Sequence, residues 1–484
     1  MLIDGRPEDS EKGTIVEIKN PASINETVAE VSMGSVEDAK RAVDSAYSAL
    51  KRWSETTPRE RSQILLKAAD LITQSESQIA ETLTREQGKT YPESLNEVRL
   101  TASVFRYYAG LAPTISGRRV QLSDPTEFGI VIKQPVGVTV AIAPWNSPVI
   151  LMSVKLAPAL AAGNTIVVKP ASSTPVADLM VCELVNKAGL PPGALNVVTG
   201  PGGIVGEELI TNKKVSKIAF TGETETGKRV MSLAAKGVKR VSLELGGSDP
   251  MIICNDADFD LAIDAALVSR FRNCGQVCMS VKRLYVQEGR YEAFIEAISE
   301  RIKKIRIGNG LEKETKMGPL HSRSQKEKII EQVSDAVDKG GKIVYGGNEP
   351  KEPTLASGYF YYPTIVTQAP LHSKLLTEEV FGPVLPVFKF STIEEAIDLA
   401  NDSVYGLGSS IWTKDLDRAM NAANNIIAGT TWINSFHEPQ IDLPFGGLKE
   451  SGLGKEMAFE GLENYLETKA VVVNARGKKR PWLD

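Results

Sequence analysis

Histidine and cysteine are scarce in this chain, and their scarcity narrows the chemistry open to it. The 484 residues include three histidines, His321, His372 and His437, and four cysteines, Cys182, Cys254, Cys274 and Cys278. Four cysteines do not build a disulfide framework in a chain of this length, so we expect a reducing cytoplasm. No histidine lies near Cys274 and Cys278 in the sequence, so we expect no zinc or other metal site.

A strong charge of either sign is also lacking, and so is a targeting segment. The net charge is −4, which gives no reason to expect nucleic acid or a membrane surface as a partner. The start, Met1–Ser10, lacks a cationic stretch followed by an apolar core, so no signal peptide is expected. The uncharged run Gln134–Val154 is long enough to suggest a membrane span, but it contains Pro135, Pro144 and Pro148. A buried strand, a turn and a helix start explain this run better.

What is present is an ordinary globular composition, 42% hydrophobic and 24% charged, with enough residues for two or three domains. The first third is predicted to be helical. Ser35–Asp38 and Thr57–Glu60 each pair a capping hydroxyl with an acid three residues later. Helical spacing continues to about residue 84, and Pro92 is expected to open another helix. Residues 117–133 are predicted to form a β-hairpin.

From Val136 the pattern changes to strands that alternate with helices. Strands are predicted at Val136–Ala143, Thr165–Lys169, Leu195–Val198, Ile218–Phe220 and Arg240–Leu243. The helices between them are predicted at Val149–Ala162, Pro175–Ala188 and Gly203–Thr211, and from about Glu225. A second run of the same kind extends from Met251 to Asn434, with a helix at Phe259–Ser269 and a strand at Leu284–Val286. This alternation predicts an α/β fold with parallel sheets that bind ligands at the carboxyl ends of their strands.

The segment Phe271–Arg283 carries the strongest chemical signal. Cys278 follows a Gly-Gln pair and precedes two basic residues, Lys282 and Arg283. The thiolate is the nucleophilic form of cysteine, and nearby positive charge favours it, although a lone cysteine is usually a small buried apolar residue. Upstream, the segment Leu-Glu-Leu-Gly-Gly places Glu244 34 positions before Cys278. Alone, such a glutamate could be a buried and paired structural acid.

These two segments, at this separation, resemble the nucleophile and general-base segments of the aldehyde dehydrogenase superfamily. Further motifs follow in the order of that family over essentially the whole chain. The resemblance implies NAD(P)-dependent oxidation of an aldehyde to a carboxylic acid. Cys278 would add to the carbonyl to give a thiohemiacetal, loss of hydride would leave a thioester, and Glu244 would activate the water that hydrolyses it.

Three further residues are implied in catalysis. The tripeptide Pro-Trp-Asn that ends at Asn146 could by itself be a turn with a helix-capping asparagine. By resemblance, the Asn146 amide and the backbone N–H of Cys278 form an oxyanion hole, in which losing one donor typically costs roughly 2.7–4 kcal/mol. Lys155 and Glu456 match a pair that relays protons from the general base in the family, and the alternative for them is a remote ion pair.

The implied cofactor is NADP or NAD. Lys169 matches a lysine that binds the adenosine ribose, and Ser172 stands where a glutamate often disfavours a 2′-phosphate, so we expect the enzyme to accept NADP. The loop Phe220–Gly227 resembles the pyrophosphate loop. It contributes Gly222 and Gly227, with Glu223 in place of a common serine. The remaining implied contacts are Trp145, Leu245, Gly246, Glu379 on the nicotinamide ribose and Phe381 behind the ring.

The resemblance also implies two doubly wound, Rossmann-like α/β domains and a small β oligomerisation arm. The expected bounds are 1–116 and 136–245 for the cofactor-binding domain, 246–450 for the catalytic domain, and 117–135 and 463–478 for the arm. A terminal strand, predicted at Tyr465–Asn474, needs a partner. In the family it pairs across subunits together with the hairpin, so a homodimer or homotetramer is expected.

Fewer residues of the sequence indicate the substrate than indicate the reaction. Arg272 matches an arginine of carboxylate-binding semialdehyde dehydrogenases, although Val154 stands where some of them carry a second arginine. Val277 lacks the basic group of some non-phosphorylating glyceraldehyde-3-phosphate dehydrogenases. We expect a small aliphatic aldehyde or semialdehyde, with glyceraldehyde or its 3-phosphate as the alternative. Glu244 opposes acyl transfer to coenzyme A, and no histidine fits a cysteine peptidase. A non-catalytic nucleotide-binding protein would be expected to lack Cys278 or Glu244.

Overall fold

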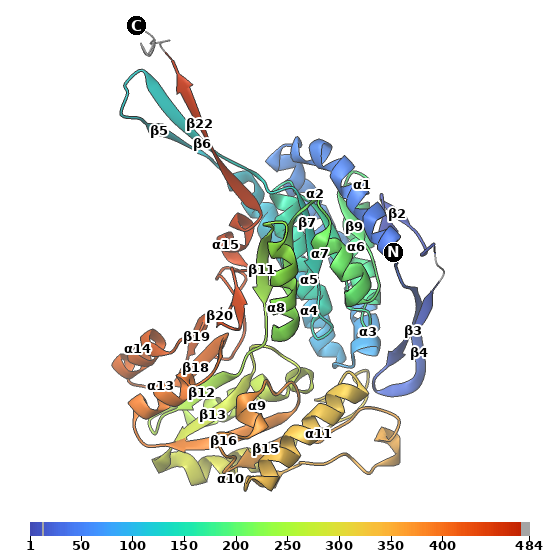
Figure 1. Cartoon of the computed structure of the whole chain (residues 1–484). Helices are drawn as coiled ribbons and strands as arrows, with labels where there is room; N and C mark the ends of the chain where they lie inside the picture. Colours follow the sequence, from blue (N-terminus) through green and yellow to red (C-terminus); the bar gives the residue numbers. More distant parts are fainter. Residues whose placement is uncertain (12–13, 476–484) are drawn as a thin grey trace.

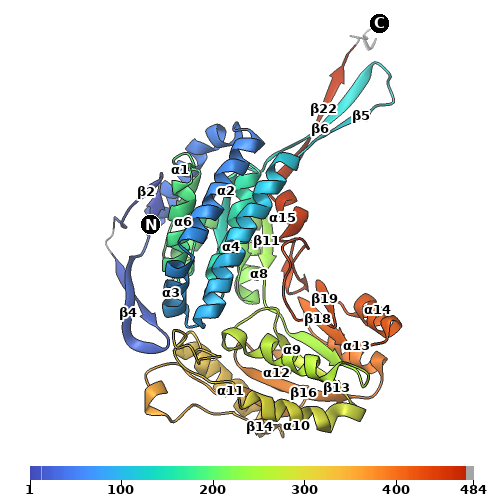
Figure 2. The ribbon, with the colours of Figure 1, turned by 180° about the vertical axis from the view of Figure 1, so that it is seen from behind.

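The computed structural model describes residues 1–11 and 14–475. Within them the chain forms two α/β domains and an arm of β-strands that projects away from both (Figures 1 and 2). The α/β fold predicted from the strand–helix alternation is therefore confirmed.

The sheet of the first domain has eight strands within the described residues, in the order β2-β1-β9-β8-β7-β10-β11-β21. Strands β9, β8, β7, β10 and β11 are parallel, and β1 and β21 pair antiparallel to them. Their bounds are β1 (Leu2–Ile3), β2 (Arg6–Pro7), β7 (Val138–Ile142), β8 (Thr165–Lys169), β9 (Leu195–Val197), β10 (Val215–Thr221), β11 (Arg240–Glu244) and β21 (Gly452–Leu453). Because β7, β8, β10 and β11 run the same way, the residues that follow them meet at one edge of the sheet.

The helices of this domain begin where the capping patterns predict. Ser35 and Thr57 each form a capping box, with Asp38 and Glu60, at the starts of α1 (Val36–Ser54) and α2 (Pro58–Gln74). Pro92 lies in the first turn of α4, as predicted. The other helices are α3 (Glu76–Gln87), α4 (Tyr91–Leu111), α5 (Pro148–Ala161), α6 (Val176–Lys187), the π-helical turn η2 (Gly202–Gly206), α7 (Glu207–Thr211) and α8 (Thr224–Ala235).

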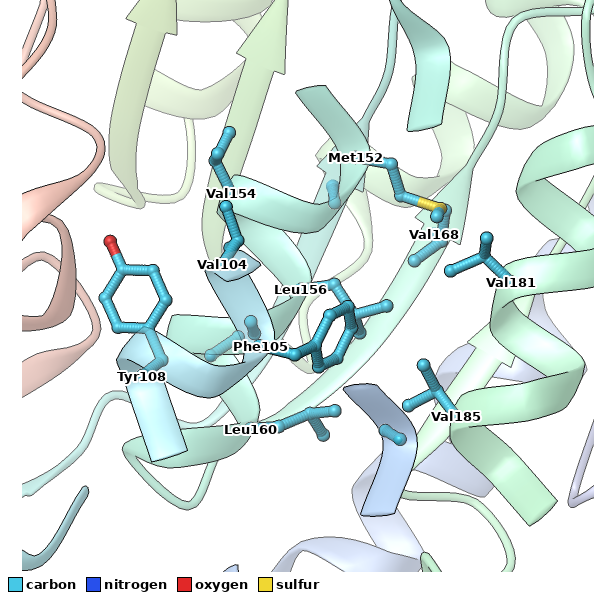
Figure 3. Close-up of a cluster of buried hydrophobic side chains, with 14 of the residues drawn as sticks. Val104, Phe105, Tyr108, Met152, Val154, Leu156, Leu160, Val168, Val181 and Val185 are labelled. Carbon is cyan, nitrogen blue, oxygen red and sulfur yellow. The ribbon is translucent and has the colours of Figure 1, made fainter. Parts of the chain in front are cut away.

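Helix α5 is buried on nearly all sides, which explains the long uncharged run in the sequence. It packs between α4, α6 and the sheet, and Figure 3 shows the side chains that fill these contacts. Each fully buried aliphatic side chain there contributes about 1.5–3 kcal/mol relative to exposure. Among the described residues, no helix is long and apolar enough to cross a membrane.

The second domain is built on a sheet with seven strands among the described residues, in the order β14-β15-β16-β13-β12-β18-β19. The strands are β12 (Asp249–Ile253), β13 (Val281–Gln287), β14 (Lys342–Tyr345), β15 (Thr364–Thr367), β16 (Val384–Phe390), β18 (Gly408–Trp412) and β19 (Thr430–Ile433). The helices are α9 (Phe259–Phe271), the short turn η3 (Arg272–Gly275), α10 (Tyr291–Ile302), α11 (Arg323–Asp338), α12 (Lys374–Thr377), α13 (Ile393–Asn401) and α14 (Leu416–Asn425). Helix α15 (Ala458–Glu463) then leads back to the first domain and the arm (Figure 1).

The arm joins the predicted hairpin to the predicted terminal strand. Strand β22 (Leu466–Asn474) pairs antiparallel with β6 (Glu127–Pro135), which pairs with β5 (Arg118–Gln121). The terminal strand therefore has a partner within its own chain. The last predicted residues of the arm, 476–478, lie outside the described residues.

The prediction that the first third is helical is wrong for its first 32 residues. There the chain forms β1 and β2 and a hairpin of β3 (Ile15–Asn20) and β4 (Ser23–Ser32). Ile18 and Val31 of the hairpin pack with Met33 against Val176 and Leu179 of α6. Strand pairing and this contact stabilise a segment that is too short and too polar to bury a helical face.

Candidate active site

A cleft lies at the carboxyl edge of the first sheet, where the two domains meet. It brings together most of the residues predicted for cofactor binding and catalysis: Trp145, Asn146, Gly222, Glu223, Leu245, Gly246, Cys278, Glu379 and Phe381. It also includes Gln325 and Lys328 of α11, which the sequence did not single out. Of the other predicted residues, Glu244, Lys155 and Glu456 lie behind this lining, and Lys169, Ser172, Gly227 and Arg272 lie outside it.

Cys278 is partly exposed at the end of a tightly wound loop. Asn273, Cys274 and Gly275 all have left-handed backbones, with φ of 49°, 55° and 72°. A side chain at Gly275 would place its Cβ 2.3 Å from the Gly382 carbonyl oxygen, so only glycine fits there. Buried Arg270 donates to the carbonyls of Gly275 and Gly382. The loop is therefore held rigidly in front of β13.

The charges around Cys278 differ from the sequence expectation. Arg283 turns away from the thiol and donates to the carbonyls of Ser248, Leu399 and Ala400. Burial raises the pKa of the Cys278 thiol to about 12, and Lys282 opposes this rise. Of the two basic residues, Lys282 alone therefore favours the thiolate.

The Asn146 side chain lies beside the nucleophile loop. Its Nδ2 donates to the Gln276 carbonyl at 3.0 Å, which uses one of its two N–H groups. Its backbone carbonyl accepts from Lys89 Nζ and from Asn273 Nδ2, both at 2.8 Å. The asparagine is thus fixed from both sides. The sequence did not identify Lys89 or Asn273 as supports.

Lys89 belongs to a buried acid–base network at the start of α4. Its Nζ lies 2.5 Å from Glu97 Oε2, while Glu97 Oε1 accepts from the backbone N–H groups of Val149 and Ile150 at the start of α5. Glu93 accepts from the backbone N–H of Asn273 at 2.7 Å. The first two turns of α4 thereby connect the start of α5 to the nucleophile loop.

Glu244 ends β11 and is 5% exposed. Burial raises its pKa well above the usual range, Glu456 adds to this rise, and Lys155 and Lys455 oppose it. Among the described residues its Oε2 has no hydrogen-bond partner. A Cβ at Gly446 would lie 2.5 Å from Glu244 Oε1, so this glycine gives the carboxyl group its space.

Lys155 and Glu456 form an ion pair next to Glu244. Lys155 Nζ lies 2.7 Å from Glu456 Oε1 and donates to Thr221 Oγ1 at 2.6 Å. Both side chains are buried, and both affect the pKa of Glu244. The pair therefore lies within electrostatic range of the Glu244 carboxyl group.

The cleft wall next to β7 is aromatic. Trp145 stacks on His321, with ring centroids 4.6 Å apart, and meets Phe381 edge to face at 5.5 Å. The Glu379 carboxylate accepts from the Gly247 N–H and lies 3.0 Å from Lys282 Nζ. A Cβ at Gly246 would lie 2.5 Å from Glu379 Oε2, so Gly246 permits this approach.

The far end of the site has a glycine-rich loop and a buried lysine. A Cβ at Gly227 in α8 would lie 2.3 Å from Leu245 Cδ2, so this glycine lets the helix start pack against the end of β11. Burial lowers the pKa of Lys169 to about 8, and its Nζ donates to the Pro170 carbonyl. The Ser172 hydroxyl donates to the Gly200 carbonyl at 2.8 Å, and Glu223 is exposed.

Arg272 lies at the start of η3, six residues before the nucleophile. Its Nη2 donates to the His437 carbonyl at 2.8 Å. Burial lowers its pKa, and Glu438, Glu93 and Cys278 oppose that change. His437 stacks on Trp432 at 4.7 Å, and burial lowers the pKa of His437 to about 3, so its ring is neutral. The sequence did not identify His437 or Trp432 as neighbours of the site.

The chain is thus a two-domain α/β protein with a cysteine, a buried glutamate and an amide donor around one interdomain cleft. Residues 8–471 match the aldehyde dehydrogenase family, and the chain belongs to that family. The betaine aldehyde dehydrogenase of Bacillus subtilis is 42% identical to it, over 100% of this chain and 99% of that protein. The NADP(+) succinate-semialdehyde dehydrogenase of Escherichia coli is 40% identical, over 98% of this chain and 97% of that protein.

A solved structure agrees over the whole chain. The betaine aldehyde dehydrogenase of Staphylococcus aureus in complex with NAD+ has a TM-score of 0.98 and 39% identity, and the match covers 100% of this chain and 96% of that one. The family expected from the sequence motifs is therefore confirmed.

Proposed function

We propose that the protein oxidises a small semialdehyde, an aldehyde that carries a distal carboxylate, to the dicarboxylic acid, with NADP or NAD as the hydride acceptor. One observation carries the proposal. A single cleft is lined by Cys278, the Asn146 amide and two glycines, Gly222 and Gly246. Buried Glu244 lies behind it. A nucleophile, an oxyanion donor and a general base are the groups that oxidation through a thioester requires.

The residues present fit a dinucleotide. The start of α8 follows Gly222, and its free N–H groups are suited to a pyrophosphate. Gly227 and Gly246 let Leu245 and Glu379 pack closely at this edge of the cleft. Lys169 would hold the adenosine ribose, Glu379 the second ribose, and Phe381 would lie behind the nicotinamide ring, with Trp145 packed edge to face against it. A bound nicotinamide would supply an acceptor for hydride.

The chain's own residues account for the attack. The Cys278 thiol must lose its proton first, and Lys282 is the neighbouring cation that favours this loss. When the sulfur adds to the aldehyde carbon, the carbonyl oxygen becomes an alkoxide. The free N–H of the Asn146 amide and the Cys278 backbone N–H would stabilise it. Fixed donors of this kind act without reorganisation, and Lys89 and Asn273 keep Asn146 in place.

Deacylation would use Glu244. A carboxyl group whose pKa is raised by burial is a better proton acceptor from water than an exposed one. The ion pair of Lys155 and Glu456 lies next to it and would carry the proton onward through Thr221. The thioester on Cys278 is hydrolysed when the activated water attacks its carbon, and the thiolate leaves.

Arg272 supports an acidic substrate. Its guanidinium lies near Cys278 and is anchored at the His437 carbonyl, which leaves other N–H donors for a carboxylate. A cationic substrate such as betaine aldehyde would be repelled by the same group. Arg272 therefore favours a semialdehyde as substrate over an aldehyde with a quaternary ammonium group.

The test compares three aldehydes of similar length: succinate semialdehyde, an uncharged straight-chain aldehyde and betaine aldehyde. The wild type should give the highest kcat/KM with the semialdehyde. Arg272→Gln should lower this value at least tenfold, about 1.4 kcal/mol, and leave the uncharged aldehyde nearly unchanged. Cys278→Ser should abolish all three activities. Glyceraldehyde and its 3-phosphate are assayed beside these three, and a higher kcat/KM on either would replace the semialdehyde assignment with that alternative.

The arm fits assembly into a homodimer or homotetramer. Strands β22 and β5 are the outer strands of its sheet, and Val472 in β22 is 63% exposed.

We assign residues 1–116 and 136–245 to cofactor binding and 246–450 to catalysis. All four cysteines are free, which suits the cytoplasm that we propose for the protein.

A further inference from the structure

Lys282 is a buried cation directly behind the nucleophile, and the reaction described above uses it only as the cation that favours loss of the thiol proton. Its side chain has 0% exposure. Its Nζ donates to the Cys278 carbonyl, lies 3.0 Å from Glu379 Oε1, and sits 5.9 Å from the centre of the Phe381 ring. Removing an ammonium from water costs several kcal/mol unless its partners compensate. An apolar residue would fill the same space at lower cost, so the charge itself needs an explanation.

The contacts of Lys282 join two parts of the site that are distant in sequence. The Cys278 carbonyl belongs to the nucleophile loop, and Glu379 follows α12 and is the carboxylate proposed to hold a cofactor ribose. Glu379 also accepts from the Gly247 N–H, in the loop that follows β11. One ammonium therefore sets the distance between the nucleophile and this carboxylate.

Other charged groups face the thiol, and most of them are acids. Three carboxyl groups raise its pKa, and they belong to Glu379, Asp249 on β12 and Glu244 on β11. Arg272 lies close enough to respond to a Cys278 thiolate, and His437 responds to Lys282 but is neutral. Lys282 is the charge that offsets Glu379, because the two form a direct ion pair.

We propose that Lys282 is a positioning residue that ties Cys278 to Glu379 and neutralises this carboxylate beside the thiol. The inference rests on the proposed role of Cys278 as nucleophile. Without the ammonium, Glu379 would face the sulfur as an unpaired anion, and the thiolate would be harder to form. A residue with a purely structural role would change stability without changing how the thiol ionises.

The test measures the ionisation of the thiol without substrate or cofactor. Iodoacetamide modifies Cys278, peptide mass spectrometry localises the adduct, and the rate is followed from about pH 6 to pH 10. Because the pKa of the thiol lies near 12, above this range, an upward shift of about one unit in Lys282→Met should appear as a roughly tenfold lower rate at each pH. Adding Glu379→Gln to this variant should reverse at least half of the shift, because the uncompensated carboxylate is then gone.

The matched control is Lys217→Met. Lys217 is also a buried lysine on a parallel strand, but it contacts Ser242 and the ring of Tyr465. Lys217→Met should lower the stability of the protein and leave the pH dependence of Cys278 alkylation unchanged. Lys282→Gln, which is uncharged but polar, replaces Lys282→Met if that variant does not fold, and it should show the same shift.

Two results separate the possible failures. Folded Lys282 variants with the wild-type alkylation profile would overturn the inference and leave Cys278 as the nucleophile. If Cys278→Ser retained aldehyde oxidation, the proposed function itself would be wrong, whatever the Lys282 variants show.

Discussion

Replacing Lys89 by methionine should damage both the stability and the catalysis of this protein. Lys89 and Glu97 are 3% and 6% exposed in their side chains, and their charged atoms are 2.5 Å apart. Methionine leaves the Glu97 carboxylate buried without its cation. Breaking a buried pair in this way typically costs about 3–5 kcal/mol. In this variant Glu97 still accepts hydrogen bonds from the backbone N–H groups of Val149 and Ile150. It also still faces the positive, N-terminal end of the α5 dipole. We therefore expect the free energy of unfolding to fall by about 3 kcal/mol, at the lower end of this range.

The same substitution removes a donor from the Asn146 carbonyl. Asn273 still holds this carbonyl, so the oxyanion donor should be loosened and not lost. The expected fall in kcat is about tenfold, which is less than the roughly 2.7–4 kcal/mol associated with complete loss of a donor. KM for the aldehyde should change little, because the loosened contact acts mainly in the transition state.

The assay combines urea unfolding, followed by tryptophan fluorescence, with kcat at saturating substrate. The control is Lys187→Met, which removes an exposed partner of Glu183 on α6 and should change stability by no more than about 0.5 kcal/mol. A Lys89→Met protein as stable and as active as the control would refute the reasoning. A Lys89→Met protein that is less stable but has an unchanged kcat would refute only the claim that Lys89 supports Asn146.

Three other predictions follow. Glu244→Gln should give a single-turnover burst of reduced cofactor and then slow or absent steady-state turnover, and normal steady-state turnover would exclude the general base. Ser172→Glu should shift the ratio of kcat/KM for NAD over NADP toward NAD at least tenfold, about 1.4 kcal/mol; an unchanged ratio would exclude Ser172 as a selector. Burial raises the pKa of Asp249 from 3.8 to about 7, so the folded state retains a proton that the unfolded state releases. Wild-type stability should therefore fall between about pH 4 and pH 7. Asp249→Asn should flatten this fall in urea midpoints, and equal slopes for the two proteins would contradict it.

The sequence by itself determined the features that depend on neighbours along the chain. The hydroxyls of Ser35 and Thr57 cap their helices because the acid that completes each box lies three residues away, within one helical turn. The strand–helix rhythm predicted the sheets, because the period of apolar residues sets which face is buried. The spacing of Glu244 and Cys278 indicated the family, since the order of motifs is itself a sequence property.

The tertiary structure alone decided which side chains meet. Lys282 and Arg283 are adjacent in sequence, but successive residues of a strand point to opposite faces. One therefore lies behind Cys278, and the other donates to backbone carbonyls near α13. Lys89 lies 57 positions before Asn146, and no local pattern connects a lysine at the start of α4 to a carbonyl before α5. The N-terminal hairpin was misjudged because pairing between strands and contact with α6 outweigh weak local preferences. Burial sets the acidity of Cys278, Glu244 and Asp249, and burial exists only once the domains have folded around them.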